Sequence, residues 1–232
     1  MNTKTLVTDG QLGQLAVRQH DFFRRVKSGS YADFDQVMAA FQVVIEGKMP
    51  EPPLLVVEPK FAKWRTFLIG GVAKKPLLQR VKAGFSVSDY AEDLMKRPQF
   101  KTQDAEESID TIVLTPADFG YERMPTTTEL LDPARLAEWS AQNAERLDGH
   151  IVELLPVEAG PHIRDQYKDQ PNGEVLWMAM ERITDSDGYP GVFAVERDSD
   201  GKQWLSTRWT DPGGQWGLDY RIVFRLRKVT QD

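Results

Sequence analysis

The phrase Asp185-Ser-Asp-Gly188 recurs as Asp198-Ser-Asp-Gly201, and the half-apolar run Val192-Phe-Ala-Val195 lies between the two copies. A turn phrase on either side of a short apolar run is typical of consecutive β-hairpins. We therefore predict an antiparallel sheet over residues 173–228, with strands at 174–184, 191–197, 202–209 and 220–228.

The two phrases also suggest calcium, because hard cations prefer clustered carboxylates. An EF-hand loop needs a glutamate six positions after its glycine, and Ala194 and Thr207 occupy those positions here. Asp and Gly are equally the residues that tight turns select. We predict that the phrases act as turns, with a cation site as the alternative.

Upstream of this sheet, helical and extended patterns alternate. Strand patterns lie at 64–69, 110–115 and 151–155, and helix patterns lie at 76–82, 88–96 and 133–147. Asp132-Pro133 has the residue types of a helix start, and 157–167 reads as a turn or a short helix broken by Gly160-Pro161. Mixed helices and strands followed by a strand-only tail predict an α+β domain over residues 51–232.

Residues 1–50 predict a helical hairpin. Apolar groups at helical spacing run from Leu12 to Val26 and again from Phe34 to Ile45. A helix-turn-helix that reads DNA shares this pattern, but plain helical hairpins are commoner. The proline-bounded segment 51–59 is the predicted boundary to the larger domain.

The composition limits the chemistry of the chain. None of the 232 residues is a cysteine, which excludes disulfides, thiolate nucleophiles and cysteine–metal sites. No window approaches the roughly 20 apolar residues of a membrane span, and the N-terminus lacks the apolar core of a signal peptide. We therefore expect a cytoplasmic protein that does not contact a membrane, and no motif indicates a cofactor or a metal.

The net charge of −6 is distributed unevenly. Residues 101–200 carry 8 basic and 22 acidic side chains, a balance of −14, whereas residues 1–100 and 201–232 are net positive at +5 and +3. A protein that coats duplex nucleic acid needs positive charge over a broad surface, so the acidic middle argues against that function. We expect the arginines of the last strand to pair with this acidic middle rather than to bind phosphate.

The window 60–82 contains seven basic and no acidic side chains. A predicted strand, Gly70-Gly71, Lys74-Lys75 and a predicted helix follow one another in it, and a glycine turn that enters a helix N-terminus favours an anion. The spacing matches neither a Walker A loop nor a dinucleotide-binding glycine motif. Lys74 and Lys75 are candidates for binding an anion or nucleic acid; the alternative is a strand edge kept soluble by lysines.

Four of the six tryptophans lie within residues 177–216, namely Trp177, Trp204, Trp209 and Trp216. The first two fall in strand patterns and are expected in the core, whereas Trp209 precedes the glycine-rich loop 210–219 and Trp216 lies within it. Long loops inside domains are often functional, and aromatic rings stack on ligands. We therefore predict a surface that binds a ligand, most simply a protein partner, through Arg208, Trp209, Trp216 and Tyr220.

Residues 158–167 carry the richest set of catalytic residue types, Glu158, His162, Arg164 and Tyr167. Such a segment offers a general acid or base beside an anion-binding arginine. No histidine has the spacing of a metal-binding helix, and no Gly-x-Ser-x-Gly marks a nucleophile. A polar connector that caps the sheet is the structural alternative. The leading hypothesis is a non-catalytic binding protein that uses the aromatic loop and the basic strand edge; a small hydrolase or transferase centred on these four residues is the alternative.

The stretch Leu155–Glu174, continued by Ala179–Gly188 and Phe193–Asp198, resembles a family of uncharacterised bacterial proteins that is frequent in small-genome lineages. The likeness covers residues 60–228 and is most distinctive over Gln166–Gly173. It implies one recurrent module. Because no activity is assigned to that family, the resemblance implies no functional residue, cofactor or partner.

Overall fold

The computed structural model describes residues 34–46 and 60–229, together with positions 8, 19, 22 and 23. The contacts divide the chain into two units, Met1–Val57 and Glu58–Asp232. In the first unit, helix α2 spans Phe34–Ile45, as the apolar spacing predicts. The other helix of the predicted hairpin lies largely outside the described residues, so the hairpin stays a prediction.

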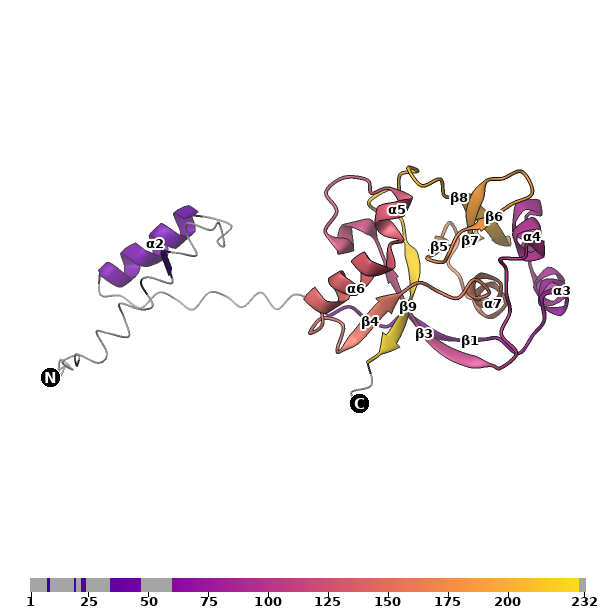
Figure 1. The fold of residues 1–232 in the computed structure, drawn as a ribbon, viewed down its shortest axis with the longest axis horizontal. Helices are drawn as coiled ribbons and strands as arrows, with labels where there is room; N and C mark the ends of the chain where they lie inside the picture. The colour runs from indigo at the N-terminus through magenta and orange to yellow at the C-terminus, as the bar shows by residue number, and fades with distance from the viewer. Residues whose placement is uncertain (1–7, 9–18, 20–21, 24–33, 47–59, 230–232) are drawn as a thin grey trace. The chain divides into compact units, whose positions relative to one another are not determined.

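The second unit combines helices and strands, which confirms the α+β class predicted from the sequence (Figure 1). None of the helices in the described ranges is long and apolar enough to cross a membrane. The elements follow in the order β1 (Arg65–Ile69), α3 (Lys74–Gly84), β2 (Ser86–Val87), α4 (Asp89–Lys96), β3 (Glu107–Leu114), η1 (Pro116–Phe119), α5 (Thr127–Leu130), α6 (Pro133–Gln142), β4 (His150–Glu153), α7 (Ala159–Gln166), β5 (Val175–Met178), β6 (Ile183–Thr184), β7 (Pro190–Arg197), β8 (Gln203–Trp209) and β9 (Ile222–Lys228).

These strands form one sheet in the order β1-β3-β9-β5-β7-β8-β2, with β4 paired to β9 and β6 paired to β7. Strands β5, β7 and β8 are antiparallel neighbours, as predicted. The last strand leaves this group: β9 lies between β3 and β5, antiparallel to the first and parallel to the second. The prediction of a purely antiparallel C-terminal sheet is therefore wrong for β9, and the predicted strand 174–184 is two strands, β5 and β6.

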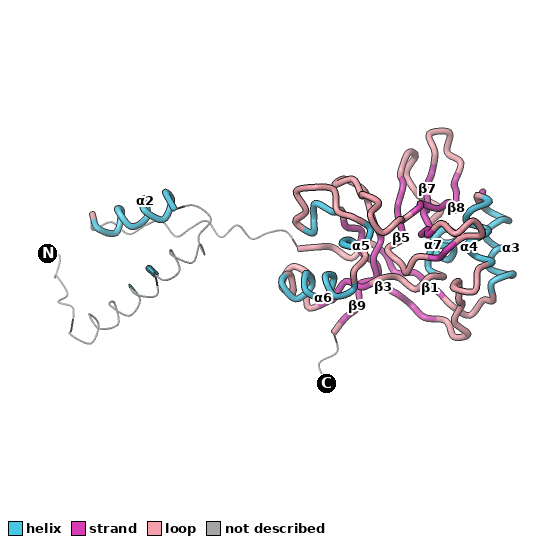
Figure 2. Tube along the Cα trace, turned by 45° about the horizontal axis from the view of Figure 1, so that its top comes forward, coloured by secondary structure: helices cyan, strands magenta, loops and turns pink. Residues whose placement is uncertain are grey.

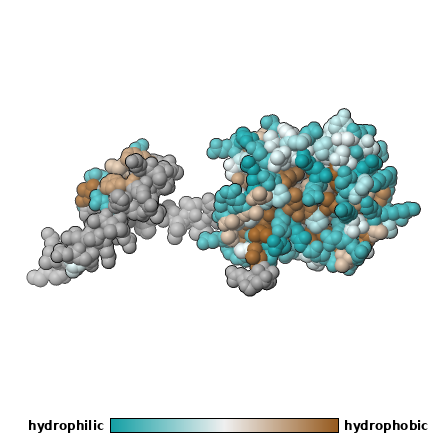
Figure 3. Space-filling view, in the orientation of Figure 1, coloured by the Kyte–Doolittle hydropathy of each residue, from teal (hydrophilic) through white to brown (hydrophobic). Residues whose placement is uncertain are grey.

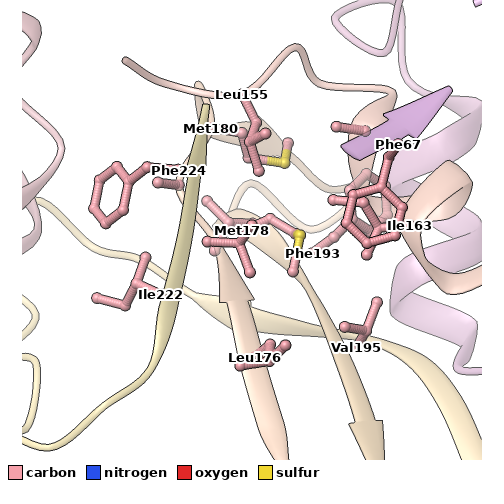
Figure 4. Packing of buried hydrophobic residues seen from close by; sticks show 14 of the residues in the cluster. Phe67, Leu155, Ile163, Leu176, Met178, Met180, Phe193, Val195, Ile222 and Phe224 are labelled. Atoms are coloured by element: carbon pink, nitrogen blue, oxygen red, sulfur yellow. The ribbon is translucent and has the colours of Figure 1, made fainter. Parts of the chain in front are cut away.

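The burial of β9 explains its central place. Ile222, Val223 and Phe224 are all fully buried, although neighbouring residues of a strand face opposite sides of the sheet. A strand buried on both faces belongs in the interior of a sheet. Figure 4 shows Ile222 and Phe224 on one side of β9, and Phe193 with Ile163 on the other.

Helices cover both faces of this sheet (Figure 2). Helix α7 packs against β1 and β7, with α3 beside it. Three strands separate β1 from β7 in the sheet order, so the sheet curves around α7. On the other face, the ring of Phe119 in η1 lies 5.3 Å from that of Phe224 and 4.6 Å from that of Trp139 in α6.

Segment 157–167 forms the buried helix α7 rather than a polar connector. Gly160 and Pro161 lie in its first turn, where proline removes no hydrogen bond that the helix needs, so they do not break it. Glycine is required at 160 because a Cβ there would lie 2.7 Å from the Cβ of Phe193. This close approach holds α7 against β7.

Polar side chains cap two helix starts, at Asp132, where the sequence predicts a helix start, and at Ser88. Asp132 Oδ1 accepts a hydrogen bond from Ala134 N (2.9 Å) at the start of α6, and Ser88 Oγ accepts one from Ala91 N (3.2 Å) at the start of α4. Helix α6 is shorter than predicted and ends at Gln142. Helix α3 begins before Pro76, at Lys74.

Both Asp-Ser-Asp-Gly phrases form strand corners, which confirms their prediction as turns. Asp185 Oδ1 accepts from Tyr189 N (2.8 Å) in the corner between β6 and β7, and Asp198 Oδ1 accepts from Lys202 N (2.8 Å) between β7 and β8. The glycine of each phrase has a positive φ, 93° and 85°. The first carboxylate of each phrase therefore bonds to the backbone of its own turn.

Candidate functional site

Three of the four predicted ligand-binding residues, Arg208, Trp216 and Tyr220, come together on one face of the sheet. The Arg208 Cζ lies 4.7 Å from the ring centroid of Tyr220, 4.8 Å from that of Trp177 and 5.3 Å from that of Trp216. A cation above an aromatic face within about 6 Å is attracted by the ring quadrupole. We name Arg208 with these three rings the arginine cage.

The register of the strands makes room for the cage. Trp177 of β5 is paired with Ala194 of β7, and Ala194 is paired with Ser206 of β8. Both intervening side chains are small, so Arg208, two residues beyond Ser206, can reach across to the indole. Trp177 and Trp204 were expected in the core, but both are half-buried. Each has a cation over its ring, Arg208 and Lys202 respectively.

The loop 210–219 is tied to the start of α5, and its tryptophan is buried there, although Asp211–Gly213, Gln215 and Asp219 are exposed. Trp216 is 1% exposed, and its Nε1–H donates to Thr127 Oγ1 (3.0 Å). The backbone of the loop adds bonds from Thr127 N to Gly214 O (2.8 Å) and from Trp216 N to Pro125 O (2.9 Å). The prediction that Trp216 offers its ring to a partner is therefore wrong. It forms a rigid wall of the cage instead.

The guanidinium of Arg208 has no polar partner in residues 60–229. Among the arginines of residues 60–229, it alone has neither a hydrogen-bond acceptor nor a carboxylate within that range. It is half-buried, and none of its nitrogen atoms is sealed from solvent without a partner. The rings thus hold the guanidinium in place while its N–H groups stay open to the outside.

Trp209 does not belong to the cage, because adjacent residues of a strand point to opposite faces. Its ring stacks on that of Tyr189 (5.5 Å between centroids, 25° between planes) and meets Tyr90 of α4 edge to face (5.9 Å). All three rings are about half exposed, at 56%, 51% and 50% for Trp209, Tyr189 and Tyr90. Neither tyrosine was predicted: the pairing of β7 with β8 brings Tyr189 to Trp209, and the packing of α4 beside β8 brings Tyr90.

The candidate catalytic residues Glu158 and His162 form a buried pair on α7. The Nε2 of His162 lies 3.5 Å from the Oε2 of Glu158, and both side chains are at most 2% exposed. Burial, reinforced by the charge of Arg80, lowers the pKa of His162 to about 4. For Glu158, burial has the opposite effect and raises the pKa, although the carboxyl accepts a hydrogen bond from Gln103 N (3.1 Å). Burial therefore disfavours the charged form of each of the two residues.

Arg164 and Tyr167 share no partner with this pair. Arg164 donates to the side chain of Gln170 and to the carbonyl of Tyr167, and burial lowers its pKa to about 10. The hydroxyl of Tyr167 donates to Glu174 Oε2 (2.7 Å), and burial, followed by this bond, raises its pKa. The four predicted catalytic residues therefore do not form one constellation.

A cavity of about 870 Å³ borders Glu158 of this pair and lies between the segment 98–103, α6, β4 and the segment 154–158. Figure 3 shows hydrophobic side chains gathered between α6 and α7 on this face. Glu158 borders the cavity, but its side chain is only 1% exposed. The described residues contain no group of three acidic or histidine side chains placed to hold a metal ion.

The basic window 60–82 is largely neutralised by the acidic middle of the chain. Lys74 Nζ donates to the carbonyl of Arg97 (2.9 Å), whereas Lys75 is exposed without a described partner. Each remaining cation has a carboxylate partner, in the pairs Lys60–Asp148, Lys63–Asp110, Arg65–Asp169, Arg80–Asp165 and Lys82–Glu92. The predicted anion site at Lys74 and Lys75 is thus reduced to one unpaired lysine.

The arginines of the last strand also pair with the acidic middle, as the charge distribution predicts. Arg227 makes a bidentate contact with Glu153 of β4, with its Nη2 2.8 Å from Oε1 and its Nε 3.0 Å from each oxygen. Arg225 pairs with Glu107 and Arg221 with Glu174. These contacts leave the outer face of β9 without a row of free cations.

Comparisons with known protein families, with curated proteins and with solved structures gave no match for this chain. The resemblance of residues 60–228 to a bacterial family therefore stays a prediction. A function for this chain has to be proposed from the geometry of the site.

Proposed function

We propose that this chain is a cytoplasmic binding protein whose arginine cage recognises a carboxylate or phosphate group on its ligand. One observation carries the proposal: among the arginines of residues 60–229, Arg208 alone has no hydrogen-bond acceptor in that range, although three rings hold its guanidinium. The absence of cysteine from the sequence suits the reducing cytoplasm.

The guanidinium determines the ligand chemistry. Its planar fork of N–H donors matches a carboxylate or a phosphate, which accept two parallel hydrogen bonds. The surrounding rings lower the local dielectric constant, and a charged hydrogen bond is stronger there than in water. An oxyanion is therefore the group that best satisfies Arg208.

The cage is also preorganised. Arg208 lies on β8, Trp177 lies on β5, and Trp216 is fixed by its hydrogen bond to Thr127. A binding group that is already held in place loses little conformational entropy when the ligand arrives. The same rigidity favours selection by shape as well as by charge.

The two other functions have less support. Glu158 and His162 lie together, as a hydrolase or transferase would need, but they are buried and Arg164 is bonded elsewhere. Nucleic-acid binding by the window 60–82 has little support, because five of its seven cations already contact carboxylates and are not free to bind phosphates.

Nuclear magnetic resonance of the ¹⁵N-labelled protein tests the proposal, with inorganic phosphate and acetate as probes. We expect either anion to shift the Arg208 Nε–H signal and the Trp216 indole signal saturably, beyond what chloride does at equal ionic strength. The anion with the lower Kd identifies the preferred oxyanion. If neither anion exceeds the effect of chloride, the proposal is wrong.

Variants separate the cage from general charge. Arg208→Gln should abolish the indole shift, and Arg208→Lys should weaken binding about tenfold because an ammonium lacks the planar fork. Lys202→Gln is the matched control, since it removes one positive charge just before β8 from above a single ring, Trp204 (4.0 Å). Equal loss of binding in Lys202→Gln and Arg208→Gln would show that the anions respond to net charge alone.

A further inference from the structure

Three exposed aromatic rings form a second surface on the face opposite the cage. Trp209 contacts both Tyr189 and Tyr90, and each of the three rings keeps about half of its surface in solvent. Single exposed apolar residues are normal, but contiguous exposed patches mark interaction sites. We name these three residues the aromatic patch.

The aromatic patch is built on ordered elements. Trp209 ends β8 and is paired with Gly191 of β7, while Tyr90 lies in the first turn of α4. The turn that carries Tyr189 is tied to α4 by a hydrogen bond from Ser186 N to Asp93 Oδ2 (2.7 Å). The rings are therefore presented in a defined arrangement rather than on a loose loop.

A hollow of about 350 Å³ beside the patch is lined mainly by acidic side chains. Asp89 and Asp187 line it, are exposed and have no ion-pair partner in residues 60–229. The cations of this region are already bonded: Lys82 and Lys96 to Glu92, Arg97 to Asp93, and Arg182 to the carbonyl of Thr210. The unsatisfied charge next to the rings is negative.

We infer that the aromatic patch, with Asp89 and Asp187, binds an arginine-rich or lysine-rich segment of a partner protein. A guanidinium stacks on an exposed indole or phenol face, and a neighbouring carboxylate binds its N–H edge. Rings alone would also suit a sugar or a second copy of this chain, but a neutral sugar leaves the charge of the two carboxylates uncompensated, and this chain carries a net charge of −6 itself. Nucleic acid is disfavoured because its phosphates would face these carboxylates.

This inference is independent of the proposed function, because the two sites lie on opposite faces of β8 and take ligands of opposite charge. The aromatic patch needs a cation, whereas the arginine cage needs an anion. A failure of one therefore leaves the other standing.

Fluorescence anisotropy of a labelled hexapeptide of alternating glycine and arginine tests the inference. We expect saturable binding that weakens as salt rises, since exposed charges are screened, and no binding of the matching glycine–glutamate peptide. Trp209→Ala should weaken binding about tenfold or more, because a central aromatic anchor dominates such surfaces. Tyr189→Ala should reduce affinity in the same direction, and near-ultraviolet circular dichroism checks that both variants keep the fold.

The twin turns supply a matched control for charge. Asp187 and Asp200 occupy the same place in the two Asp-Ser-Asp-Gly phrases, and both are exposed, but only Asp187 lines the hollow. Asp187→Asn should weaken peptide binding about threefold or more, while Asp200→Asn should leave it within about twofold. Equal effects of the two substitutions or unchanged affinity in Trp209→Ala would each overturn the inference. So would a protein that binds maltohexaose but does not bind the peptide.

Discussion

The buried Glu158–His162 pair makes the stability of the fold depend on pH in a way that a substitution can isolate. The His162 side chain is 2% exposed, and burial, with the charge of Arg80, lowers its pKa to about 4. In the unfolded chain the same imidazole binds its proton near pH 6.5. Between these values the unfolded state binds more protons, so the folded state loses stability as the pH falls.

The size of the effect follows from the two pKa values of His162. One pH unit inside the window changes the free energy of unfolding by at most about 1.4 kcal/mol. Acidification from about pH 7 to about pH 5 should therefore remove roughly 2 kcal/mol through His162. Glu158 acts in the opposite sense, since burial raises its pKa and the folded state keeps that proton as the pH rises.

Urea unfolding followed by tryptophan fluorescence measures both contributions in wild type, His162→Gln and Glu158→Gln. The stability advantage of wild type over His162→Gln should shrink by roughly 2 kcal/mol between about pH 7 and about pH 5. Relative to Glu158→Gln, wild type should gain stability over the same interval. Identical pH profiles for wild type and His162→Gln would refute the conclusion that the folded protein holds this imidazole neutral.

Two further predictions concern the contacts that hold α7 inside the curved sheet. Gly160→Ala should cost about 1–3 kcal/mol in urea unfolding, because the added methyl group would lie 2.7 Å from Phe193 Cβ. Gly213→Ala, whose Cβ meets nothing within 4 Å, should be near neutral, and equal stabilities would contradict the prediction. Gln166→Ala should cost about 1–2 kcal/mol and speed hydrogen exchange at Leu68, because the Gln166 amide donates to Leu68 O (2.8 Å) and accepts from Leu68 N (3.0 Å). Unchanged exchange at Leu68 would show that this edge is protected by something else.

The features that could be predicted from the sequence are those with a local cause. A short polar side chain followed by glycine bends a chain without help from the rest of the molecule, so both Asp-Ser-Asp-Gly corners were found. The same holds for the Asp132 cap of α6, whose hydrogen bond spans two residues. The charge pairing of the last strand was also predictable, because a segment with a balance of −14 needs compensating cations nearby.

The place of β9 in the sheet has no local cause. Its alternating pattern is compatible with an edge strand beside β8, and only long-range pairing with β3 and β5 puts it at the centre. The burial of α7 depends in the same way on contacts with β1 and β7. A segment with Glu158, His162 and Arg164 reads as a polar connector until the rest of the protein surrounds it.

In the candidate site, local and long-range causes differ between two adjacent residues. The sequence predicts Arg208 and Trp209 on one surface because both lie directly before the glycine-rich loop 210–219, next to each other in the chain. In an extended strand adjacency has the opposite meaning, since each step of one residue reverses the face. Arg208 therefore enters the cage, and Trp209 joins Tyr189 and Tyr90 on the other side.

Because of this alternation, the end of β8 carries two surfaces that bind ligands of opposite charge, and the sheet separates them. Arg208, which has no polar partner in residues 60–229, lies against Trp177 of β5 and Trp216 of the loop 210–219. The carboxylates of Asp89 and Asp187, which have no ion-pair partner in the same range, lie on the α4 side. If one flat surface held both charges, they would pair with each other and leave nothing for a ligand. The sheet between them prevents that pairing. A ligand that bridges both surfaces would have to pass around the end of β8, so Arg208→Gln should leave peptide binding unchanged and Trp209→Ala should leave anion binding unchanged.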